Sequence, residues 1–179
     1  MDNERKRIDP IVLKDAMIPY NTDTWKPRNF RGLERVSDGK VVNREGERNF
    51  CVFLKPDQVD CEQLIENGWN IKKSENPTDP QAEPSYMLRV KVKYHPDGSD
   101  LKRLNPRVLV CTQNGEMEMD EDNIGDLDSA QIVKANMTIH GTWRESPMYT
   151  GVVAYLSKLV VRVYEDNGSL DDLKEGIMD

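Results

Sequence analysis

Three cations recur at every second position of one segment, and their types and spacing suit contact with phosphate groups. Arg89, Lys91 and Lys93 fall on one side of residues 85–94, and apolar or aromatic side chains fill the alternate positions. Side chains on one face of a β-strand are about 7 Å apart, which is close to the repeat of phosphates in an extended nucleic acid strand. We therefore predict that these three residues bind a phosphate backbone. The alternative is that they form only the solvated outer face of a strand.

A second segment, near the N-terminus, alternates aromatic rings with basic side chains. Single-stranded nucleic acids are bound by basic grooves that follow the backbone and by rings on which the bases stack. Trp25, Lys26, Arg28 and Arg31 provide both kinds of group, so we expect them to contact such a strand. Trp25 packing the segment down is the alternative, and Phe30 is predicted to belong to the core.

Two loops add further basic and aromatic side chains. Arg44 and Arg48 flank a turn signal rich in Asn and Gly, which are residues that tight turns prefer. Trp143, Arg144 and Tyr149 lie in the loop between the last two predicted strands. We expect Arg44 and Arg48 to line the same groove as the cations described above, and the loop with Trp143, Arg144 and Tyr149 to fold over the bound strand.

The residues that could support catalysis do not form a recognisable active site. His95 and His140 are the only histidines, and neither has the spacing of metal ligands. The sequence contains no glycine-rich phosphate loop and no nucleophile elbow. One acidic cluster lacks the spacing of a calcium loop, so we expect a solvated surface formed by Glu116, Glu118, Asp120, Glu121 and Asp122. We expect no enzymatic activity, no metal and no cofactor.

Basic and acidic residues are concentrated in different segments of the chain. The formal net charge is -7, yet residues 24–55, 85–112 and 131–164 each carry more basic than acidic residues. Residues 165–179 carry six acidic residues and one lysine. An overall negative charge therefore does not exclude a nucleic acid partner, because the cations gather in the segments that read as strands.

The elements that must position these residues are mostly short strands. We predict strands at 29–33, 49–54, 85–94, 107–112, 132–143 and 152–164, with an Asn-Gly hairpin turn after the fourth. Helices are expected at 56–67 and 122–130. This pattern predicts a mainly β protein, a small OB-fold-like β-barrel with one or two short helices and flexible termini. A small β-sandwich is the alternative.

Three regions follow from this pattern. Residues 1–28 are expected to form an N-terminal arm, interrupted by prolines, in which only residues 11–16 could be a short helix. Residues 29–164 form the barrel domain, and residues 165–179 form an acidic flexible tail. The tail could occupy the basic groove until DNA displaces it and could offer replication or recombination proteins a point of attachment. A tail that only aids solubility is the alternative.

The hydropathy of the chain and its cysteines indicate the cellular compartment. No apolar run is long enough to span a membrane, and the first ten residues lack an apolar signal region. Cys51, Cys61 and Cys111 are scattered and odd in number, which favours a reducing cytoplasm over a disulfide framework.

Several stretches resemble phage single-stranded DNA-binding proteins in their order and spacing. They are residues 44–54, 67–72, 86–94, 107–115, 127–132 and 150–156. The resemblance implies an OB-fold, binding of single-stranded DNA without sequence specificity during phage replication, no cofactor, and a place in the cytoplasm of the bacterial host. The chain lacks the terminal aromatic residue with which several such proteins dock partners, since it ends Gly176-Ile177-Met178-Asp179.

Three functions are consistent with the sequence. The first is a protein that coats and protects single-stranded DNA during replication, recombination or repair. The second is a β-sandwich virion or protein-interaction module that does not bind nucleic acid. The third is a metal-dependent nuclease that uses the acidic cluster. We favour the first, and binding of RNA instead of DNA stays open, because a stacking platform need not sense the 2′-hydroxyl.

Overall fold

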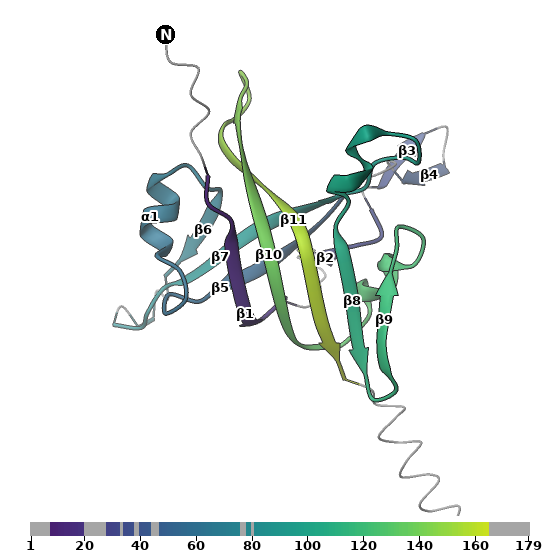
Figure 1. Cartoon of the computed structure of the whole chain (residues 1–179). Helices are drawn as coiled ribbons and strands as arrows, with labels where there is room; N and C mark the ends of the chain where they lie inside the picture. The colour runs from purple at the N-terminus through teal and green to yellow at the C-terminus, as the bar shows by residue number, and fades with distance from the viewer. Residues whose placement is uncertain are drawn as a thin grey trace, which may run out of the picture.

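The computed structural model of the chain describes residues 8–19, 28–32, 34–37, 40–43, 47–75, 78–79 and 81–164 (Figure 1). The predictions for Trp25, Lys26, Arg44 and the acidic tail lie outside these residues. Strands dominate the described chain, so the predicted mainly β class is confirmed. No helix in this part of the chain is long and apolar enough to cross a membrane.

Within the described residues, one sheet of nine strands holds most of the regular structure. Its main path runs through β1 (Ile11–Ala16), β10 (Ile132–Glu145), β11 (Thr150–Val163), β7 (Ser85–Lys93), β5 (Glu47–Leu54) and β2 (Arg28–Asn29). Three strands branch from this path: β7 also pairs with β6 (Ile71–Ser74), and β11 also pairs with β8 (Arg107–Thr112), which in turn pairs with β9 (Gly115–Met119). A separate hairpin consists of β3 (Glu34–Ser37) and β4 (Lys40–Asn43).

The sheet curls until its two ends nearly meet (Figure 1). Neighbours on the main path are antiparallel, except that β11 and β7 run parallel. Just beyond β1 the chain reaches β5, where the Phe53 amide donates to the Met17 carbonyl oxygen at 3.0 Å. No ladder joins β1 to β5 in the part of the chain that is described, so the barrel stays partly open. This is the OB-fold-like arrangement that the strand pattern predicts.

The core lies inside the curl and is built from the inward-facing positions of the strands. β7 alternates as predicted: Leu88, Val90 and Val92 have no exposed surface, whereas the residues between them are exposed. Phe30 and Phe50 are fully buried and stack with their ring centroids 5.0 Å apart. Burial of each such side chain contributes roughly 1.5–3 kcal/mol.

The first strand corrects one expectation. Residues 11–16 form β1 and not a short helix, because Ile11 and Leu13 are buried while Val12 and Lys14 are exposed. A period of two over so few residues between prolines is easily overlooked. The expected N-terminal arm therefore contributes a strand to the sheet, paired with β10.

The helices differ in length and type from those expected. α1 (Cys61–Glu66) begins only where Asp60 accepts a hydrogen bond from the Gln63 amide at 3.1 Å, because residues before Asp60 form turns. The second expected helix is the short 3-10 helix η2 (Ile124–Asp128), which buries two apolar side chains. A further 3-10 helix, η1 (Asp100–Leu104), was not predicted.

Candidate nucleic-acid interface

The predicted row of cations lies along the outer face of β7. Arg89, Lys91 and Lys93 are all exposed. On the neighbouring strand β5, Asn49 stands directly opposite Lys91 and accepts a hydrogen bond from Arg89 Nη1 at 2.7 Å. A side chain of β5 thus holds one cation of the row by a hydrogen bond.

A tyrosine extends this face on the other side of β7. Tyr155 of β11 is the register partner of Lys91, and His140 of β10 stands opposite Tyr155. Arg144, further along β10, donates a hydrogen bond from Nη2 to the Tyr155 hydroxyl oxygen at 3.1 Å. Residues opposite each other share a face of the sheet, so a ring and a fourth cation lie beside the row on β7.

Two adjoining hollows mark the surface between these side chains. The smaller, of about 120 Å³, is bordered by Asn49, Lys91, Lys93, Arg144 and Tyr155. The larger, of about 390 Å³, shares Lys93 and Tyr155 with it. None of the described residues that line either hollow is acidic. We call this surface, formed by Asn49, Arg89, Lys91, Lys93, Arg144 and Tyr155, the cationic groove.

The cationic groove combines two kinds of interaction suited to a single strand. Its ammonium and guanidinium groups can pair with successive phosphates, and the guanidinium of Arg144 can do so with two parallel hydrogen bonds. The Tyr155 ring offers a face for stacking a base. On β5, opposite Arg89, burial raises the pKa of the Cys51 thiol, and the nearby charges of Arg89 and Lys72 oppose that effect.

Arg48 borders the smaller hollow, but its guanidinium points into the barrel. It stands opposite the buried Val92, its side chain is only 12% exposed, and its Nη1 lies 3.6 Å from Glu121 Oε1. Its Nη2 also donates to the Glu121 carbonyl oxygen at 3.1 Å, and its guanidinium carbon lies 5.4 Å from the centre of the Tyr94 ring. Strand parity directs the Arg48 guanidinium inward, so the structure does not place it in the row of exposed cations on the outer face.

Arg28 is also buried, with 3% of its surface exposed. Its guanidinium donates to the carbonyl oxygens of Pro19 and Ile18, both at 3.1 Å. It also donates to those of Leu127 at 3.2 Å and Ala130 at 2.5 Å. Arg28 therefore joins the chain after β1 to the chain around η2, and the structure does not bring it to the cationic groove.

Two other predicted residues, Arg31 and Trp143, lie away from the groove. Arg31 is exposed but lines neither hollow, and its backbone amide donates to Asp128 of η2. The Trp143 indole donates to Glu145 Oε1 at 3.0 Å and packs on Gly68. Its ring is on the other face of β10 from Arg144 because the two residues are adjacent in a strand.

Tyr149 has a local role in the β10–β11 hairpin. Its hydroxyl donates to the Val152 carbonyl oxygen at 2.9 Å. Burial raises its pKa. Tyr149 lines neither hollow, so the structure does not bring it to the cationic groove.

Tyr155 and Asn49 are groove residues that the sequence prediction missed. In β11, Ala154 and Leu156 are buried, so a tyrosine between them faces outward, and this alternation was a signal that could have identified it. The parallel pairing that places Tyr155 beside Lys91 joins positions 64 residues apart. No local sequence pattern indicates such a contact.

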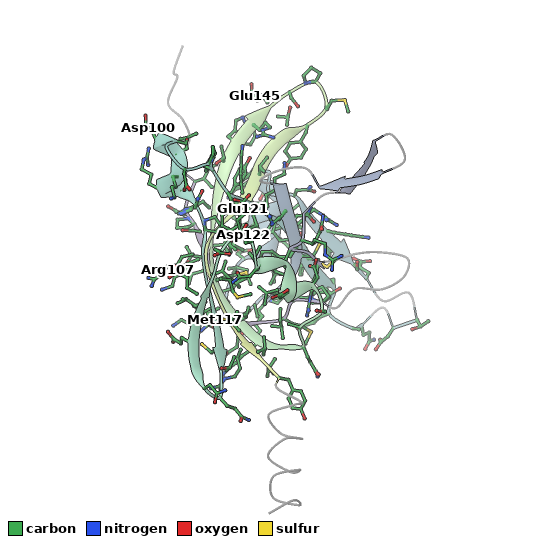
Figure 2. All side chains as sticks on the ribbon, turned by 90° about the vertical axis from the view of Figure 1, so that its right-hand side faces the viewer. Asp100, Arg107, Met117, Glu121, Asp122 and Glu145 are labelled. Carbon is green, nitrogen blue, oxygen red and sulfur yellow. The ribbon has the colours of Figure 1, made fainter. Side chains whose placement is uncertain are left out.

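The acidic cluster occupies a different surface. Glu116 and Glu118 are exposed on β9, and Asp120 accepts hydrogen bonds from the amides of Asp122 and Asn123. Figure 2 shows Glu121 and Asp122 together in the connection that follows β9. Among the residues the structure describes, no three His, Cys, Asp or Glu side chains are placed to hold a metal ion.

Comparisons with known proteins identify the family and the fold. Residues 2–172 match the profile of the family described as "Putative phage ssDNA-binding domain". The fold is similar to that of the single-stranded DNA-binding protein from bacteriophage Enc34 in complex with ssDNA, with a TM-score of 0.52, 12% identity and 88% of each chain covered. A C-terminal truncation of the Enc34 protein gives a TM-score of 0.50 at 12% identity, with 88% of this chain and 87% of the other covered. No curated protein sequence matches.

Proposed function

The chain belongs to the family of phage single-stranded DNA-binding domains, and we propose that it binds single-stranded DNA in the cationic groove without sequence specificity. The phosphates would lie along the cations of β7, with Arg144 at one side. Contacts of this kind fix a strand in place and do not read its sequence.

The observation that carries this proposal is the continuity of the groove across three strands. β7 provides a row of cations, and β11 and β10 add a ring and a further cation that are hydrogen-bonded to each other. The described residues that line the two hollows include no carboxylate. A strand of phosphates placed there meets cations throughout, although the whole chain has a net charge of -7.

The groove favours single strands over duplexes for a geometric reason. Tyr155 can stack only on a base whose face is free, and in a duplex each base is covered by its neighbours. Backbone contacts alone would still permit weak duplex binding, because phosphates are common to both forms.

We further propose that the protein acts by coverage and not by turnover. It would coat and protect single strands during phage replication, recombination or repair in the cytoplasm of the bacterial host, with no cofactor. The barrel, through residue 164, would carry the binding site. The six acidic residues among positions 165–179 would compete with DNA for the groove and be available to partner proteins.

A titration tests the proposal directly. The full chain is added to fluorescein-labelled single-stranded DNA, duplex DNA and RNA of equal length, at 50 and 200 mM salt, and anisotropy is followed. We expect the tightest binding to single-stranded DNA, with similar affinity for different sequences and a large loss of affinity at the higher salt. Absence of binding to single-stranded DNA at 50 mM salt would overturn the proposal.

A further inference from the structure

The larger hollow beside the cationic groove has a different chemistry from the groove itself. It has a volume of about 390 Å³, within the range of small-molecule pockets, and its walls are mostly apolar. Leu104, Leu156 and the Tyr155 ring provide the carbon surface. This carbon surface suits the face of a base better than a phosphate, which requires charged or polar partners.

Polar groups lie at a few places in the wall of this pocket. His95, His140 and Thr142 line it, and Lys93 belongs both to it and to the smaller hollow. Imidazole and hydroxyl groups can each donate and accept hydrogen bonds. The pocket is therefore lined by both apolar and polar groups, and it shares the cation of Lys93 with the groove.

The wall contributed by η1 is held in place by side-chain contacts. Asn105, which follows η1, accepts a hydrogen bond from the His95 amide at 2.6 Å and donates one to the His95 carbonyl oxygen at 3.3 Å. Ser99 caps the start of η1 by accepting from the Leu101 amide at 3.2 Å. Figure 2 shows η1, marked by Asp100, at the same end of the molecule as the β10–β11 hairpin, marked by Glu145.

Leu104 remains 53% exposed although it lies at the wall of an apolar pocket. A single exposed leucine needs no explanation, but here it lines the same pocket as an aromatic ring and a lysine. A flat ligand between them would cover the leucine and contact the ring. Tyr155 also lines the smaller hollow, together with Lys91 and Arg144.

We propose that this pocket receives one unpaired nucleobase of the bound strand, between Tyr155 and Leu104, while the phosphates of the same strand occupy the cationic groove. The inference rests on the proposed function and adds a specific base site to it. Because a paired base cannot leave its stack without cost, the pocket would select single strands over duplexes. Imidazole and hydroxyl groups at its edge would contact the hydrogen-bonding edge of the base without demanding one base type.

Two leucines on η1 provide a matched pair of variants. Leu104 lines the pocket, whereas Leu101, which is 46% exposed on the same short helix, does not. We would compare Leu104→Asn with Leu101→Asn, and add Thr142→Tyr, which fills the pocket from β10. Each variant is first shown to melt as a folded protein, so that a change in binding is not a change in folding.

The two probes are an oligothymidylate and a strand of the same length in which every nucleotide is abasic. Both carry the same phosphates, but only the first has bases. We expect Leu104→Asn and Thr142→Tyr to weaken binding of oligothymidylate roughly tenfold, on the order of one stacked base. The same variants should bind the abasic strand as the wild type does, and Leu101→Asn should match the wild type on both.

The outcomes separate this inference from the proposed function. If the wild-type chain binds neither strand, the proposed function fails and the base site with it. If the wild type binds oligothymidylate but the pocket variants leave that affinity unchanged, or weaken both strands equally, only the base site is overturned. If Thr142→Tyr does not fold, the comparison of Leu104→Asn with Leu101→Asn decides the question alone.

Discussion

Arg144 reaches across the β10–β11 hairpin and donates a hydrogen bond of 3.1 Å to the hydroxyl oxygen of Tyr155. The contact places a guanidinium at the hydroxyl end of a ring that lines both hollows. It holds the ring in one orientation on the outer face of the sheet. A charge for phosphate and a surface for a base are thereby fixed relative to each other before DNA arrives, which lowers the entropic cost of binding.

Replacement of Arg144 tests this arrangement. Arg144→Ala removes both the charge and the tether, and we expect the affinity for oligothymidylate to fall about tenfold, a loss near that of one stacked base. Arg144→Lys keeps the charge but loses the planar fork, so its affinity should be intermediate while its salt dependence stays that of the wild type. Fluorescence anisotropy at several salt concentrations measures both quantities. Wild-type affinity in Arg144→Ala would contradict the role of this residue.

Removal of the cations of β7 should reduce the salt dependence of DNA binding. Each phosphate contact on a single strand contributes about 0.7 to the slope of log K against log salt. The double variant Lys91→Ala, Lys93→Ala should therefore lower the slope by roughly 1.4. Lys14→Ala is the control, because Lys14 is exposed on β1 and lines neither hollow. An equal decrease in the control would show that the effect is one of net charge and not of the groove.

The row on β7 was predictable because its information is local. Alternation over nine residues fixes both the strand and the face on which Arg89, Lys91 and Lys93 lie. Tyr155 was not predictable in the same way, since its place beside Lys91 depends on a parallel pairing between distant strands. The curl of the sheet follows from many such pairings. The strands were therefore predicted more successfully than the residues that form the groove.

Arg28 and Arg31 show where residue type alone fails. Both are arginines in one short segment that also contains aromatic residues, and the same reasoning assigned both to DNA. The structure buries Arg28 among four carbonyl oxygens and leaves Arg31 exposed. A buried arginine needs acceptors that come from elsewhere in the chain, here from the region of η2. The local sequence around Arg28 does not indicate these acceptors.

Arg28 should accordingly affect stability and not DNA binding. Arg28→Ala leaves buried carbonyl oxygens without partners, and we expect a decrease in the free energy of unfolding on the order of 3 kcal/mol. Arg31→Ala, at an exposed position of the same segment, should change it by less than about 0.5 kcal/mol. Urea unfolding followed by tryptophan fluorescence measures both. A large loss of DNA affinity in folded Arg28→Ala, with unchanged stability, would contradict the structural role.

The raised pKa of the buried Tyr94 side chain should make the free energy of unfolding depend on pH under alkaline conditions. Burial raises its pKa from the ordinary value to about 12, with the charge of Arg48 opposing the shift. The folded protein therefore keeps the phenolic proton at a pH where the unfolded chain has lost it. The free energy of unfolding is therefore unaffected by this group below the ordinary pKa, near 10, and falls by at most roughly 2–3 kcal/mol as the pH rises to 12.

Tyr94→Phe separates this effect from other alkaline changes. In the described structure the Tyr94 hydroxyl is buried with no hydrogen-bond partner, so its removal should leave the stability at pH 7 unchanged or slightly higher. Between pH 10 and 12 the variant should lose less stability than the wild type, as measured by urea unfolding at fixed pH steps. Tyr164→Phe, at a position that is 47% exposed, serves as the matched control and should follow the wild-type curve. If Tyr94→Phe also follows that curve, the proton of Tyr94 does not contribute to alkaline unfolding.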